Sequence, residues 1–122
     1  MEKTILGNDL EICRILNGMW QVAGGHGQID SKLAIQEMQK YQELGFTTWD
    51  LADIYGPAES LIGDFNKKEE YNFQAFTKFV PNPGPMSNSI VTYYIDESLK
   101  KMNTDCIDLL QFHWWDYQDS NY

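Results

Sequence analysis

Cysteine is scarce in this chain, which excludes most cysteine chemistry. Of the two cysteines, Cys13 lies near the start and Cys106 near the end, in no spacing typical of a zinc site. Two such residues do not build a disulfide framework, and they fit reduced thiols in a cytosolic compartment. His26 and His113 have no third ligand at a sensible spacing. We therefore predict no metal site.

Long hydrophobic runs and basic residues are also lacking. The opening stretch, MEKTILGNDLEICRILNGMW, is interrupted by charges, so we expect neither a secretory signal nor a membrane span. The chain has 9 Lys and Arg against 18 Asp and Glu, and its formal net charge is -9. An acidic surface repels phosphate backbones, which argues against a nucleic-acid partner. These absences predict a cytoplasmic protein that does not associate with membranes.

Apolar residues are plentiful enough for one domain over residues 1–122. Hydrophobic residues make up 43% of the chain and aromatic residues 14%, so we expect a modest core. Two β-prone arms around Gly7-Asn8-Asp9 predict a hairpin. Strands are then predicted at residues 14–20, 46–52, 73–80 and 105–115, with helices at residues 30–44, 57–65 and 90–103. This alternation predicts a parallel sheet covered by helices, either doubly wound or closed into a barrel.

Capping residues and apolar faces mark the helices. Asp30 or Ser31 can cap the first helix, and Gly45 should end it. Pro57 suits the first position of the second helix. The expected apolar faces are Ala34, Met38, Tyr41 and Leu44 in the first helix, Leu61, Ile62 and Phe65 in the second, and Val91, Ile95, Leu99 and Met102 in the third.

Polar side chains fall at the C-terminal ends of successive predicted strands. Asp50 and Tyr55 follow the second strand, Lys78 lies in the third, and His113 lies at the end of the fourth. In parallel α/β folds, chemistry collects at that edge of the sheet. Alternation places Phe76, Lys78 and Val80 on one face of their strand, and Ile107, Leu109, Gln111 and His113 on one face of the next.

Each of these residues also has a structural interpretation. A strand-end Asp often caps a turn, Tyr55 before Gly-Pro can fill the turn, and His113 beside two tryptophans can be a core imidazole. Lys78 differs, because burying its ammonium costs free energy unless an anion pairs with it. Four placements at successive strand ends together favour a functional site.

The segments around these residues resemble the N-terminal half of the aldo-keto reductase family. GFTTWDLADIYGPAESLIG, residues 45–63, is similar to the family's Gly-Phe/Tyr-x-x-Asp-x-Ala-x-x-Tyr-Gly segment. FTKF, residues 76–79, resembles the lysine strand, and SLKKMNTDCIDLLQFHW, residues 98–114, resembles the Asp-x-Ile-Asp-Leu-x-x-x-His segment. LEICRILNGMWQ, residues 10–21, is similar to the opening hairpin and first strand.

The resemblance implies a TIM-type (β/α)8 barrel, here truncated to roughly four strands behind an N-terminal β-hairpin. It also implies reduction of aldehydes or ketones with NADPH or NADH. The family's catalytic positions map to Asp50, Tyr55, Lys78 and His113. In this interpretation Asp50 is the ion partner that keeps Lys78 charged, which explains an acid at the end of a buried strand.

Carbonyl reduction needs a proton donor, because hydride delivery leaves negative charge on the carbonyl oxygen. A phenol has a pKa of about 10 and is a poor donor near neutrality. An adjacent ammonium favours the phenolate and lowers the pKa of a phenol, so Lys78 would make Tyr55 a usable general acid. His113 would donate a hydrogen bond to the carbonyl oxygen and orient the substrate.

The resemblance further implies a cofactor surface and a substrate pocket. Gly18 and Met19, with Asp50, match positions where the family's first strands approach the nicotinamide ribose. Apolar substrate would pack against three tryptophans, Trp20, Trp114 and Trp115.

The sequence stops after the fourth predicted strand, whereas a (β/α)8 barrel has about 250 residues. In the family, the residues that bind the nicotinamide amide and the adenosine phosphate follow later strands, which this sequence does not contain. A half barrel also leaves two open strand edges and exposes inner-face residues such as Ile15, Phe76 and Leu109. We therefore expect a homodimer or aggregation through those edges.

Three functions remain open on the sequence alone. The first is an NAD(P)H-dependent carbonyl reductase, or part of one, that acts on a small-molecule carbonyl compound. The second is a non-catalytic binding or regulatory module, since the family includes channel-associated subunits. The third is a truncated gene product with no activity of its own.

Overall fold

The computed structural model describes residues 1–25, 27–68 and 72–120 of the chain. A hairpin comes first, in which β1 (Lys3–Leu6) pairs antiparallel with β2 (Leu10–Cys13). The strands that follow are β3 (Asn17–Gly18), β4 (Thr48–Asp50), β5 (Gln74–Phe79) and β6 (Leu109–Phe112). The helices between them are the 3-10 helix η1 (Trp20–Ala23) and the α-helices α1 (Ser31–Glu43), α2 (Ala58–Asn66) and α3 (Asn88–Met102).

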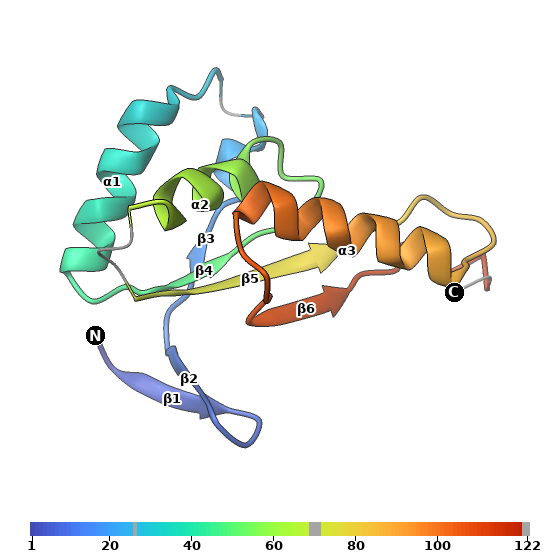
Figure 1. Cartoon of the computed structure of the whole chain (residues 1–122), viewed down its shortest axis with the longest axis horizontal. Helices are drawn as coiled ribbons and strands as arrows, with labels where there is room; N and C mark the ends of the chain where they lie inside the picture. The colour runs from blue at the N-terminus through green and yellow to red at the C-terminus, as the bar shows by residue number, and fades with distance from the viewer. Residues whose placement is uncertain (26, 69–71, 121–122) are drawn as a thin grey trace.

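The four later strands form one parallel sheet in the order β3-β4-β5-β6. All three α-helices lie against one face of this sheet, and the hairpin β1–β2 projects beyond the N-terminal end of β3 (Figure 1). The predicted alternation of parallel strands and helices behind an N-terminal hairpin is thus confirmed. The polar residues singled out in the sequence lie at the carboxyl edge of this sheet.

Local capping explains where the helices begin and end. The Asp30 carboxylate accepts hydrogen bonds from the N–H groups of Lys32 at 2.8 Å and Leu33 at 3.1 Å, which caps α1 as predicted. Gly45 follows α1 with a φ of 85°, and its N–H donates to the Gln42 carbonyl. This left-handed residue ends the helix and directs the chain into β4.

The core lies between the sheet and its helices. Its fully buried members are Met19, Met38, Trp49, Leu51, Ala58, Leu61, Ile62, Phe65, Ala75 and Met102. The helices α2 and α3 lie close together at Gly63, where a Cβ would overlap the Lys101 carbonyl oxygen. Glycine is therefore required at this crossing. Leu61, Ile62 and Phe65 are all buried, so the predicted apolar side of α2 is confirmed.

The α1 face and the first strand differ from expectation. Leu44 is 69% exposed and Tyr41 is 48% exposed, while Met38 is buried as predicted. Leu44 follows the last residue of α1, so it no longer lies on the helix stripe that packs inward. The strand expected over residues 14–20 is only two residues long, and Ile15 and Leu16 remain exposed.

The inner face of the sheet is less open than the sequence predicts. Phe76 is buried, because Asp50 of β4 and Leu109 of β6 flank it in the parallel register. Ile15 is exposed as expected. Within the described residues β3 and β6 each pair with one strand only, so dimerisation through these edges stays a prediction. No helix of the described part is long and apolar enough to cross a bilayer.

Candidate functional site

An ion pair between β4 and β5 forms the centre of the candidate site. The Lys78 ammonium donates to Asp50 Oδ1 at 2.8 Å and to the main-chain oxygen of Leu51 at 2.5 Å. The Lys78 side chain is only 13% exposed, against 31% for Asp50. The partner predicted for Lys78 from the cost of burying an ammonium is therefore present. Both side chains lie on the inner face, opposite the helices.

The phenol of Tyr55 lies beside this ion pair. Its ring centroid is 5.1 Å from Lys78 Nζ, close enough for attraction between the ammonium and the ring. Its hydroxyl makes no hydrogen bond to any described residue, which leaves it free to donate to a ligand. Trp20 meets the Tyr55 ring edge-on, with centroids 5.0 Å apart. Four side chains from β4, β5, η1 and the intervening turn thus meet at the carboxyl edge.

The turn that carries Tyr55 is held by close main-chain packing. Tyr55 N–H donates to the Ala52 carbonyl at 3.0 Å, so the chain leaves the strand direction there. Gly56 follows with a φ of 53°, and its Cβ position would lie 3.3 Å from the Cα of Ala23. A side chain at Gly56 would combine a disfavoured φ with a tight contact. The sequence Tyr-Gly-Pro therefore packs the turn against η1.

His113 lies at the same edge, but its side chain is not held by the other three residues. Its main-chain N–H donates to the Phe79 carbonyl at 2.9 Å, which extends the β5–β6 ladder by one bond. In the register Lys78 lies opposite Gln111, two residues before His113. The imidazole is exposed and makes no hydrogen bond to a described residue. The structure thus places His113 on the predicted face without fixing its ring.

The tryptophans have three different environments. Trp20 is 56% exposed and packs on Tyr55, as a substrate wall requires. Trp114 stacks on Phe112, and its indole donates to the main-chain oxygens of Asp116 and Asp119. Phe112 contacts Phe79, which contacts Tyr94 of α3. The structure therefore places Trp114 on the helix side of the sheet and does not bring it to Tyr55.

Trp115 is tied to the loop after β5. Its indole N–H donates to the Pro81 carbonyl at 3.2 Å, while half of its surface stays exposed. This bond holds the segment after β6 against the proline-rich loop. That Trp115 lines a substrate pocket stays a prediction.

The predicted cofactor positions on β3 differ in what they present. Gly18 lies opposite Asp50 in the register, and nothing lies within 4 Å of where its Cβ would be. Met19 is 4% exposed, packs into the helix-side core, and donates its N–H to the Asp50 carbonyl at 2.9 Å. The Met19 carbonyl in turn accepts from the Val22 N–H at 3.1 Å, so the buried Met19 side chain is not presented to a ligand.

Sequence reasoning missed Asp53, a second carboxylate in the same segment. Its side chain accepts hydrogen bonds from the Val80 N–H, at 3.1 Å to Oδ2 and 3.3 Å to Oδ1. Burial raises the pKa of Asp53; the Val80 bond lowers it and the nearby Glu59 carboxylate raises it further. The signal that could have found it is the spacing Asp-Leu-Ala-Asp, which places two acids around the end of β4.

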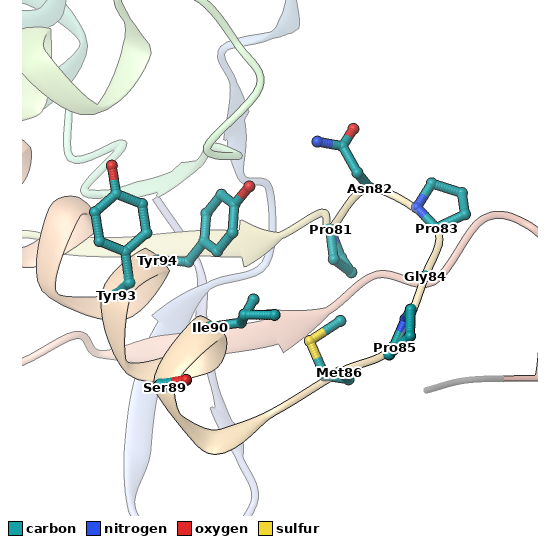
Figure 2. A pocket seen from close by; sticks show the side chains of 10 residues that line it. All are labelled: Pro81, Asn82, Pro83, Gly84, Pro85, Met86, Ser89, Ile90, Tyr93 and Tyr94. Carbon is teal, nitrogen blue, oxygen red and sulfur yellow. The ribbon is translucent and has the colours of Figure 1, made fainter.

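A separate pocket of about 480 Å³ lies between the loop after β5 and α3 (Figure 2). Figure 2 shows the loop curving past Tyr94 and Ile90, and the Met86 side chain at the end of the loop points toward Ile90. Asp50, Tyr55, Lys78 and His113 do not line it. His26 lies outside the described residues, and within those residues no group of three potential ligands could hold a metal ion.

The hairpin and the four parallel strands that alternate with three α-helices, with polar residues at the carboxyl edge, match part of a (β/α)8 barrel. Residues 14–121 match the Aldo/keto reductase family, and the chain belongs to that family. The 6-dehydroglucose reductase of Agrobacterium fabrum is 30% identical in an alignment 131 residues long, gaps included, that spans 93% of this chain and 43% of that protein.

Solved structures show the same fold. The thermostable aldo-keto reductase Tm1743, in complex with the inhibitor epalrestat, matches with a TM-score of 0.79 and 23% identity over 97% of this chain and 44% of its own. An aldo-keto reductase from Klebsiella pneumoniae in complex with NADPH matches with a TM-score of 0.70 and 20% identity, over 85% of this chain and 36% of its own. The chain thus spans less than half the length of these relatives.

Proposed function

We propose that residues 1–122 form the N-terminal half of an aldo-keto reductase domain, which contributes the proton-donating site for NAD(P)H-dependent reduction of small-molecule carbonyl compounds. The observation that carries the proposal is the Asp50–Lys78 ion pair beside the Tyr55 phenol. Burying part of an ammonium costs free energy, so its placement next to a phenol that bonds to no described residue favours a chemical role.

The chain's own residues have distinct tasks in this reaction. Asp50 pairs with the Lys78 ammonium and, together with the Leu51 carbonyl, fixes its direction. The ammonium stabilises negative charge that develops on the phenol as Tyr55 gives its proton to the carbonyl oxygen. The exposed imidazole of His113 is free to turn and donate a hydrogen bond to that oxygen. Trp20 shields one side of the phenol from water.

The residues present fit the nicotinamide-ribose end of a dinucleotide cofactor. Open space over Gly18, beside the partly exposed Asp50 carboxylate, offers a surface for a ribose and its hydroxyl groups. When bound, NADPH would supply the hydride. The family and the Klebsiella pneumoniae structure solved with NADPH support NADPH as the cofactor, with NADH as the alternative.

Cofactor binding and turnover test the proposal with the purified chain. Titration into NADPH or NADH should give saturable enhancement of cofactor fluorescence, and an aldehyde should then accelerate cofactor oxidation. Tyr55→Phe should lower turnover by about 10²–10⁴-fold, because the proton donor is lost, while cofactor affinity stays the same. Tyr93→Phe, an exposed tyrosine of α3, is the matched control and should leave both unchanged.

Two results would contradict the proposed function. A flat fluorescence titration at high protein concentration would leave the chain without a cofactor. Equal turnover in Tyr55→Phe and Tyr93→Phe would remove Tyr55 as the acid.

A further inference from the structure

The carboxylate of Asp53 completes the hydrogen-bonded ladder between β4 and β5. Main-chain bonds continue this ladder past the end of β4, from Leu51 N–H to the Phe76 carbonyl at 2.8 Å and from Asp53 N–H to the Lys78 carbonyl at 3.1 Å. In a regular parallel ladder, Val80 N–H would next donate to the main-chain carbonyl of Asp53. It donates to the Asp53 side chain instead.

This exchange of acceptors occurs where the two strands diverge. The chain turns away after Asp53, since Tyr55 N–H donates back to the Ala52 carbonyl. The side chain of Asp53 reaches across and keeps Val80 attached to the turning segment. Tyr55 lies two residues after Asp53, and Lys78 lies two residues before Val80. One carboxylate therefore links the segment that carries the phenol to the segment that carries the ammonium.

The surroundings of Asp53 indicate that its acceptor geometry matters more than its charge. The side chain is half-buried, and burial disfavours the anion. Glu59 of α2 adds a second negative charge nearby, while Lys101 of α3 offsets it in part. A neutral acceptor of the same shape would avoid these costs and keep the bond to Val80 N–H.

We propose that Asp53 is a positioning residue, whose side-chain bond to Val80 N–H holds Lys78 at its contact distance from Tyr55. This inference rests on the proposed function, because the contact matters for catalysis only if Tyr55 is the acid. It assigns Asp53 no contact with substrate or cofactor. The acceptor oxygen is the feature that counts, so asparagine should replace aspartate and alanine should not.

Lysine accessibility tests the inference on the whole chain without any cofactor. Brief competitive acetylation at neutral pH, read by mass spectrometry, gives the modification rate of each lysine. Asp53→Ala should raise the rate at Lys78 by about fivefold, the equivalent of one net hydrogen bond of about 1 kcal/mol. Asp53→Asn should keep the wild-type rate within about twofold.

Internal and matched controls separate local from global effects. The exposed Lys32 and Lys40 report general loosening and should react equally in all variants. Asp64→Ala removes an exposed carboxylate of α2 and should leave Lys78 unaffected. Nuclear Overhauser contacts between the Tyr55 ring and the Lys78 side chain should persist in Asp53→Asn and weaken in Asp53→Ala.

Two outcomes overturn the inference. One is a folded Asp53→Ala chain in which Lys78 keeps its wild-type acetylation rate and its contacts with the Tyr55 ring. The other is an Asp53→Asn chain in which the acetylation rate of Lys78 rises more than twofold. That result contradicts the inference even if the alanine variant does not fold. Neither result depends on NADPH binding, so failure of the proposed function would be seen separately.

Discussion

Gly63→Ala should destabilise the protein, because α2 and α3 leave no room for a side chain where they cross. A Cβ at this position would overlap the Lys101 carbonyl oxygen and lie 3.1 Å from the Lys101 carbonyl carbon and 3.2 Å from that of Met102. These are main-chain atoms, which no rotamer change can move aside. Carbon atoms pack at about 3.5–4.0 Å, so α3 would have to shift by at least about 0.5 Å.

The expected loss follows from two opposing effects. Overpacking of a filled core costs about 1–3 kcal/mol, and a clash with the backbone favours the upper end of that range. Alanine regains about 1 kcal/mol through its higher helix propensity. The free energy of unfolding should therefore fall by about 2 kcal/mol, which corresponds to a drop in Tm of about 8 °C for a domain of this size.

Urea denaturation followed by circular dichroism measures this loss. Ser60→Ala, an exposed position of the same helix, is the matched control and should change the free energy of unfolding by less than about 0.5 kcal/mol. An equal midpoint for Gly63→Ala and the wild type would refute the close helix crossing and the packing derived from it.

Three further predictions concern charge and capping. Lys78→Met should lower the free energy of unfolding by about 1–2 kcal/mol, because it leaves the partly buried Asp50 unpaired. Lys40→Met breaks an exposed ion pair and should lower the free energy of unfolding by at most about 0.5 kcal/mol in the same urea experiment. The pKa of Asp53 is raised in the folded state, so its contribution to stability is complete below the usual value of 3.8 and is lost as the pH rises through the folded-state pKa. Asp53→Asn should therefore gain stability relative to the wild type between acidic and neutral pH, and parallel pH–stability curves would contradict this. Asp30→Ala should cost about 1 kcal/mol through loss of the α1 cap, measured by the same denaturation, and an unchanged midpoint would refute the capping role.

The order of elements could be predicted because each is marked by local chemistry. Gly7 turns the hairpin, Asp30 caps α1, and Gly45 ends it, each in the conformation that its residue type favours. The lengths of the elements were less predictable, because apolar residues such as Ile15 predict a strand in the sequence although they remain exposed in the structure. Hydrophobicity marks where a chain can pack, but tertiary contacts decide whether it does.

The candidate site was predictable where burial forced a partner. Lys78 in an apolar strand required an anion, and Asp50 supplies it. Trp114 and Asp53 were harder, for different reasons. Strand alternation places Trp114 on the helix side of β6, which the resemblance alone did not separate from the inner face. The bond from Val80 to Asp53 depends on where two strands diverge, a feature that no single segment encodes.

The role of Tyr55 as proton donor can be measured by deuterium transfer to an aldehyde from NADPH labelled at the reactive carbon of its nicotinamide ring. Mass spectrometry of the alcohol detects even slow turnover by the purified chain. We expect deuterium on the former carbonyl carbon with the wild type and at least about 10²-fold less with Tyr55→Phe. Label at the same level in both proteins, or in neither, would contradict it.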